Sequence, residues 1–166
     1  TSHELNTIKE LPEQELLKLI NYGKIEEFKN RVLYVGANKQ YGMAENEDIY
    51  FQSMEARNPA YQEMPDIVNN YMEKINKIME TNYKPFNYYG VDDAENIIIA
   101  MGSVCDTTKL VVDKLNKENH KVGLIEVHLY RPFSTKYLKQ VLPKTTKNIA
   151  VLDRTKDPGA NGEPLY

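Results

Sequence analysis

The sequence predicts an α/β fold, with a mainly parallel sheet in a three-layer α/β/α arrangement and a helical and irregular N-terminal arm. Three short apolar segments, at residues 96–101, 121–129 and 147–153, have the length of buried strands. Helix-like segments separate them, which is typical of parallel strands joined by right-handed crossovers. With 166 residues, 41% of them apolar and 27% charged, the chain has the composition of a globular domain.

The two halves of the chain differ in pattern. Nine of the twelve tyrosines precede Gly90, whereas all the strand-like segments follow it. We therefore assign residues 1–90 to an N-terminal helical extension and arm, and residues 91–166 to the α/β core, within one structural domain overall. The core is expected to end at a truncated domain boundary, since the sequence stops at Gly-Glu-Pro-Leu-Tyr.

Helices are expected at both ends of the extension. Apolar residues recur at helical spacing within residues 1–34, and Asn21-Tyr22-Gly23 is the expected break between two helices. Residues 35–62 show no sustained period and are expected to form an irregular arm. A further amphipathic helix is expected to begin at Pro65, because proline suits the first turn of a helix.

Two helices are expected between the strands of the core. The first follows Gly102-Ser103 and carries Leu110, Val111 and Leu115. The second begins near Ser134 and ends at Pro143, because proline cannot continue a helix.

Composition excludes several classes of protein. A net charge of −3 argues against a general nucleic-acid binder, and no apolar segment is long enough to span a membrane. The one cysteine, Cys105, allows no internal disulfide and cannot alone hold an iron–sulfur cluster. The histidines, His3, His120 and His128, lack the close pairing of helical metal sites. With no secretory leader visible, a reducing, cytoplasmic setting is expected.

The turn at residues 102–106 is the most site-like motif of the core. A strand that passes into a helix at Gly102-Ser103 could place helix amides around an anion. The alternative, which we favour, is a tight turn in which Ser103 caps the helix and Asp106 completes the cap. Cys105 is expected to be a packing residue, since no histidine lies nearby to activate it. We assign no catalytic, cofactor-binding or metal-binding residue.

Two kinds of surface are expected to dock onto neighbouring domains. Residues 48–52 place aromatic side chains in an arm that has no evident core, so Ile49, Tyr50 and Phe51 should be partly exposed in this chain. The loops after two strands, residues 129–134 and 153–159, carry arginine with proline, aromatic or glycine residues. The candidate docking residues are Tyr50, Phe51, Arg131, Arg154 and Lys156.

The sequence resembles one enzyme family over nearly its whole length. Residues 129–134 (Leu-Tyr-Arg-Pro-Phe-Ser), 149–160 and 162–166 resemble pyruvate:ferredoxin (flavodoxin) oxidoreductase, and residues 98–104, 48–52 and the opening Thr1-Ser2-His3-Glu4 fit the same family. The resemblance is to the second domain of that multidomain enzyme, which is similar to the C-terminal domain of transketolase. It therefore implies a transketolase C-terminal-like sheet for this chain.

The resemblance also implies a parent reaction. Members of the family decarboxylate pyruvate oxidatively with coenzyme A, giving acetyl-CoA and carbon dioxide, and pass the electrons to ferredoxin or flavodoxin. Their thiamine diphosphate, magnesium and iron–sulfur clusters are held by other domains, and their chains form a homodimer. The resemblance thus implies a structural and docking domain whose partners are other domains of one polypeptide, inactive when isolated.

Two other functions remain open at this stage. One is a domain of a related 2-oxoacid oxidoreductase, whose substrate-pocket residues would lie outside this chain. The other is a free-standing module that binds a small anion at the Gly102-Ser103 edge.

Overall fold

The computed structural model describes residues 7–39, 42 and 44–166. The opening Thr1-Ser2-His3-Glu4, which includes one of the three histidines, lies outside the described residues. Contacts divide the described chain into two compact units. One contains residues 9–63 and the other contains residues 64–166 together with residues 7 and 8. Each unit is described by itself below.

The unit of residues 9–63 consists of short helices. Helix α1 covers Glu13–Leu19 and α2 covers Tyr22–Lys29, so the expected break near residue 21 is confirmed. Asn21 fixes this break, because its side-chain oxygen accepts a hydrogen bond of 3.1 Å from the Lys24 amide and so caps α2.

A third helix corrects the expectation of an irregular arm over residues 35–62. Helix α3 covers Glu47–Glu55 within that range. Glu47 and Asp48 lie in its first turn, where carboxylates interact favourably with the helix dipole. The helix is only 9 residues long, which is too short for a repeating apolar pattern to show.

Helix α4 covers Asn58–Met79 and begins earlier than the sequence indicated. Pro65, the expected start, lies inside the helix and is its one buried residue among those described. A proline removes one helical hydrogen bond, but burying its ring compensates in part for that loss.

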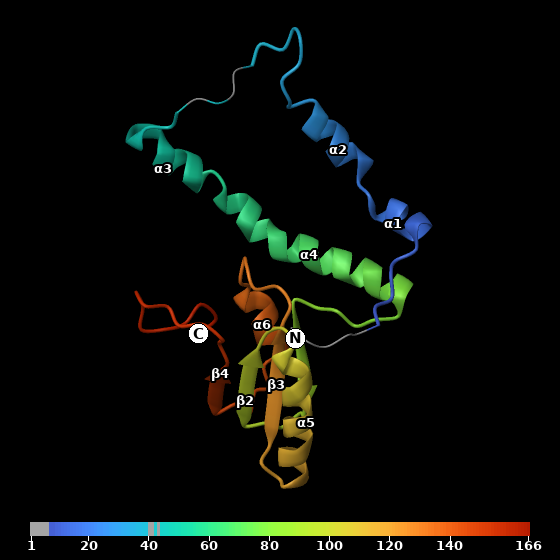
Figure 1. The fold of residues 1–166 in the computed structure, drawn as a ribbon, viewed down its shortest axis with the longest axis vertical. Helices are drawn as coiled ribbons and strands as arrows, with labels where there is room; N and C mark the ends of the chain where they lie inside the picture. Colours follow the sequence, from blue (N-terminus) through green and yellow to red (C-terminus); the bar gives the residue numbers. More distant parts are fainter. Residues whose placement is uncertain (1–6, 40–41, 43) are drawn as a thin grey trace. The chain divides into compact units, whose positions relative to one another are not determined.

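A four-stranded sheet forms the centre of the second unit (Figure 1). Its strands are β1 (Phe86–Gly90), β2 (Asn96–Ala100), β3 (Val122–Val127) and β4 (Asn148–Val151), in the order β1-β3-β2-β4. Strand β2 pairs in parallel with β3 and with β4, whereas β1 pairs antiparallel with β3. The mainly parallel α/β sheet is confirmed.

Strand β1 lies before the expected start of the core at residue 91. Its five residues form the edge of the sheet, with Phe86 opposite Val127 and Gly90 opposite Gly123. The segment contains a polar residue and ends in glycine, so its apolar pattern is too short to indicate a strand. In the structure, the sheet therefore begins at Phe86.

Helices cover both faces of this sheet. Helix α5 (Val104–Lys117) packs Cys105 and Val112 against Leu124, and α6 (Thr135–Val141) packs Tyr137 and Leu138 on the face that carries Ile125. Leu124 and Ile125 are both fully buried, because successive strand residues point to opposite faces. The α/β/α layering follows from this alternation.

The inward face of α5 differs from the one that its apolar residues suggest. Leu110 and Val111 are 71% and 46% exposed, whereas Cys105, Thr108 and Val112 are buried. Thr108 satisfies its hydroxyl within the helix by donating to the Val104 carbonyl at 2.8 Å, so a polar residue can face the sheet.

Candidate functional site

Two loops meet at the carboxyl edge of the parallel strands. The turn after β2 and the loop after β4 together line a cavity of about 600 Å³, which we call the edge groove. Its lining residues are Met101, Gly102, Ser103, Val104, Thr107, Leu152, Asp153 and Arg154. The loop from Asp153 lies beside the turn at Gly102, because the parallel strands β2 and β4 end at the same sheet edge.

The turn into α5 does not form the expected cap. Gly102 adopts a φ of +79°, which suits glycine, and the Cys105 amide donates to its carbonyl at 3.1 Å. Ser103 already has helical dihedral angles and its side chain makes no capping hydrogen bond. The Asp106 Oδ1 atom lies 3.7 Å from the Lys109 Nζ atom, one turn further along the helix. The capping interpretation of Ser103 and Asp106 is therefore wrong, although the tight glycine turn is present.

Cys105 is a packing residue, as expected. It is 4% exposed and lies in the cluster formed by Ala100, Val112 and Leu124. Burial raises the pKa of its thiol, and the nearby Glu126 carboxylate raises it further. A thiol with a raised pKa is a poor nucleophile at neutral pH, which agrees with a packing role for Cys105.

The loop of residues 152–166, here the C-terminal loop, closes on itself. The Asp153 Oδ2 atom accepts hydrogen bonds from the Leu165 and Tyr166 amides at 3.1 and 3.2 Å. Lys156 forms an ion pair of 2.7 Å with Glu163. Leu165 also packs on the core cluster of the sheet. These contacts give the loop a defined shape, and they show that Lys156 already has an internal partner.

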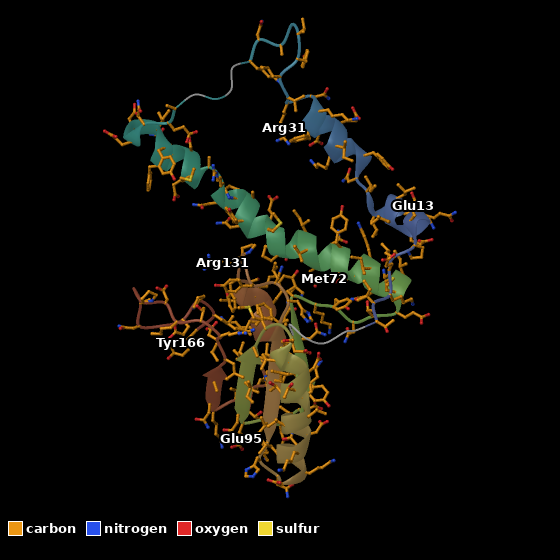
Figure 2. The ribbon with its side chains drawn as sticks, viewed as in Figure 1. Glu13, Arg31, Met72, Glu95, Arg131 and Tyr166 are labelled. Atoms are coloured by element: carbon orange, nitrogen blue, oxygen red, sulfur yellow. The ribbon has the colours of Figure 1, made fainter. Side chains whose placement is uncertain are left out.

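The two arginines among the candidate docking residues differ in their surroundings. Arg131 lies 4.9 Å from the centre of the Tyr130 ring, and its Nη2 donates to the Tyr130 hydroxyl at 3.1 Å. That hydroxyl donates in turn to the Pro164 carbonyl, which ties Arg131 to the C-terminal loop. Figure 2 labels Arg131 and Tyr166, which mark the two segments that this bond joins. Arg154 is exposed, and no side chain among the described residues forms a hydrogen bond or ion pair with it.

The aromatic candidates lie on α3. Ile49, Tyr50 and Phe51 are 41%, 52% and 70% exposed, so their expected exposure is confirmed. They belong to a helix rather than to an irregular segment. Their docking role is addressed below as a proposal.

A polar cluster that the sequence did not indicate joins α4 to α6. Asp66 accepts hydrogen bonds of 2.7 Å from both Lys136 and the Tyr137 hydroxyl. These bonds lower the pKa of Asp66, and burial together with this carboxylate raises the pKa of Tyr137 to about 12. The partners are 70 residues apart or more, so no local pattern indicates the cluster. These hydrogen bonds hold α4 and α6 together at this point.

Within residues 7–39, 42 and 44–166, no group of three or more histidine, cysteine, aspartate or glutamate side chains is arranged to hold a metal ion. No helix in the same part of the chain combines the length and apolar character needed to cross a bilayer.

Comparisons with known proteins identify relatives over the whole chain. Residues 94–166 match the family model described as pyruvate:ferredoxin oxidoreductase core domain II. The chain is 50% identical over 165 residues to the pyruvate-flavodoxin oxidoreductase of Klebsiella pneumoniae and 45% identical over 166 residues to the pyruvate:ferredoxin oxidoreductase of Moorella thermoacetica. These alignments cover 99% and 100% of this chain but 14% of each relative.

A third relative is named for NADP(+) rather than for ferredoxin or flavodoxin. The mitochondrial pyruvate dehydrogenase [NADP(+)] of Euglena gracilis is 45% identical over 166 residues, which is 100% of this chain and 9% of that protein. This chain thus spans about a seventh of the length of the bacterial relatives above, and less of the Euglena protein.

Proposed function

We propose that this chain, which belongs to the pyruvate:ferredoxin oxidoreductase family, acts as a structural and docking domain of a longer oxidoreductase. The parent enzyme decarboxylates pyruvate oxidatively with coenzyme A, gives acetyl-CoA and carbon dioxide, and passes electrons to ferredoxin or flavodoxin. The names of the relatives from Klebsiella and Moorella support pyruvate as the substrate and flavodoxin or ferredoxin as the electron acceptor. We further propose a cytoplasmic homodimer whose remaining domains contact this one.

One observation carries the docking role. None of the described residues between Lys9 and Glu63 is buried, although this unit contains many large apolar side chains. Its complete helices α1, α2 and α3 have only 7, 8 and 9 residues, and isolated helices of that length are marginal in water. A stable fold for this unit requires an apolar partner surface, which the rest of a longer polypeptide would supply.

The cofactors of the parent reaction do not fit the described residues. An iron–sulfur cluster needs several thiolates, and Cys105 is the only cysteine and is buried. Thiamine diphosphate is bound through a magnesium ion, and the described residues contain no group of three or more histidine, cysteine, aspartate or glutamate side chains arranged to hold a metal ion. We therefore assign these cofactors to other domains and derive no catalytic step here.

The docking role can be tested with matched surface variants in the full polypeptide. Phe51→Ala should lower the unfolding temperature of the full polypeptide but leave that of the 166-residue chain nearly unchanged. Leu110→Ala is the control, because Leu110 on α5 is 71% exposed, like Phe51 at 70%. Equal effects of the two variants on the full polypeptide would contradict docking through α3.

Activity and binding measurements on the 166-residue chain separate the alternatives. With pyruvate, coenzyme A and an electron acceptor, the chain should give no turnover, because it lacks the cofactor ligands. Calorimetric titration with coenzyme A, thiamine diphosphate and phosphate should give no binding heat. Binding would instead support the small-anion module at the Gly102-Ser103 edge. A related 2-oxoacid specificity would be revealed by substrate comparison in the full enzyme.

A further inference from the structure

Among the described residues that line it, the edge groove combines apolar side chains with one cation, Arg154. Val104 at the start of α5 and Leu152 directly after β4 both line the groove and are each 43% exposed. Arg154 follows Leu152 and lines the same cavity. Exposed apolar side chains beside an arginine have the composition of an interface more than that of a solvent-facing turn.

The charged side chains next to Arg154 in the sequence already have partners in the C-terminal loop. The Asp153 carboxylate accepts from the Leu165 and Tyr166 amides, so it is directed into the C-terminal loop. Lys156, two residues after Arg154, is paired with Glu163. Arg154 is thus the cation of the edge groove that has no partner among the described residues.

We propose that the edge groove receives a segment of the same longer polypeptide, from outside residues 1–166, that carries a carboxylate next to an apolar side chain. The carboxylate binds the Arg154 guanidinium, which matches a carboxylate with two parallel hydrogen bonds. The apolar side chain packs between Val104 and Leu152. This inference rests on the docking function proposed above and names the chemistry of one docking contact.

The exposure of Arg154 favours a tethered segment over a free ligand or a second copy. An ion pair at an exposed site gains at most about 1 kcal/mol, which is too little to hold a small carboxylate from dilute solution. A segment that the rest of the same polypeptide already holds beside the groove loses little further freedom on binding, so the ion pair and the apolar contact need to supply little free energy to keep it in place.

The position of Lys156 makes it a useful contrast to Arg154. Both are exposed cations of the C-terminal loop, but the ion pair with Glu163 commits Lys156 to the shape of that loop. Removing Lys156 should therefore leave the groove's charge intact, whereas reversing Arg154 should repel the incoming carboxylate.

Photo-cross-linking in the full polypeptide tests the proposal. A benzophenone amino acid at Val104 should cross-link to a segment outside residues 1–166 that contains Asp or Glu, as mapped by mass spectrometry. The same probe at Leu110, on the outer surface of α5, should give no such product. A probe at Leu152 provides a second reading if the Val104 variant fails to fold. Mixing isotope-labelled and unlabelled protein distinguishes contacts within one chain from contacts between copies.

Charge variants then test the carboxylate. Arg154→Glu should lower the cross-linked fraction about fivefold, as loss of an exposed ion pair predicts, whereas Lys156→Ala should leave it unchanged. Replacing the mapped carboxylate residue by arginine should restore the yield in the Arg154→Glu background. Cross-links only within residues 1–166, only between copies, or insensitive to Arg154→Glu would overturn the proposal. If those results appear while Phe51→Ala still destabilises the full polypeptide, the docking function stands and only this contact is wrong.

Discussion

The close approach of Tyr88 to Gly123 gives the most quantitative prediction for the sheet. The Tyr88 side chain on β1 covers Gly123 on β3, so a Cβ atom added at Gly123 would collide with the Tyr88 hydroxyl oxygen and lie 2.6 Å from its ring carbon Cε2. Atoms cannot approach that closely, and the ring must move. Its hydroxyl would then lose the hydrogen bond that it donates to the Val91 carbonyl.

The cost of Gly123→Ala can be estimated from these contacts. Forcing an extra methyl group into a packed site costs about 1–3 kcal/mol, and a lost hydrogen bond adds about 1 kcal/mol. Reduced chain entropy in the unfolded state returns about 0.4–1 kcal/mol. The net loss in the free energy of unfolding should be about 2 kcal/mol, which corresponds to a fall in unfolding temperature of about 4–8 °C for a chain of this size.

Circular dichroism with thermal and urea unfolding measures this loss. Gly159→Ala is the matched control, because its nearest neighbour would be the Asp157 carboxylate at an ordinary 3.6 Å. It should change stability by less than about 0.5 kcal/mol. In a Tyr88→Ala background, Gly123→Ala should cost at least about 1 kcal/mol less than in the native chain. Equal stabilities for the Gly123 and Gly159 variants would refute the packing described here.

Two further predictions concern ionisable groups. The pKa of Tyr137 is raised to about 12, so the folded state favours its neutral form. The resulting contribution to the free energy of unfolding is present below about pH 10 and is lost as the pH rises toward 12. Tyr137→Phe should therefore flatten the alkaline limb of the pH–stability curve, and an unchanged limb would contradict the Asp66 contact. Cys105 should react slowly with Ellman's reagent in the native chain and rapidly in denaturant, since its thiol is buried and the pKa of that thiol is raised. Equally rapid reaction in both conditions would contradict the packing of Cys105.

The regular elements of the core could be predicted because their patterns are local. The apolar run Ile97-Ile98-Ile99 ends at the Gly102 turn, and the helix before Pro143 has a proline stop, so each element has an apolar run and a boundary in a few residues. Strand β1 lacks such a run, and its pairing with β3 connects Phe86 to Val127. A pairing across that distance in sequence leaves no periodic pattern.

The sequence predicts the position of the edge groove but not the partners of the charged side chains around it. Parallel strands end at one edge, which brings the Gly102 turn and Arg154 together without further information. Whether each charged side chain has a partner depends on contacts that spacing in the sequence does not reveal. Lys156 pairs with Glu163, and Asp153 binds amides of Leu165 and Tyr166. These contacts separate Lys156, held within the loop, from Arg154, which has no such partner among the described residues.

Hydrogen–deuterium exchange of the 166-residue chain and of the full polypeptide tests the docking role most directly. In the 166-residue chain, amides of α1 to α3 should exchange within seconds, while those of β2 and β3 stay protected, because only the latter are packed in a core. In the full polypeptide, amides of α1 to α3 should become strongly protected. Equally fast exchange of α1 to α3 in both proteins would contradict the account of residues 9–63 as a docking unit.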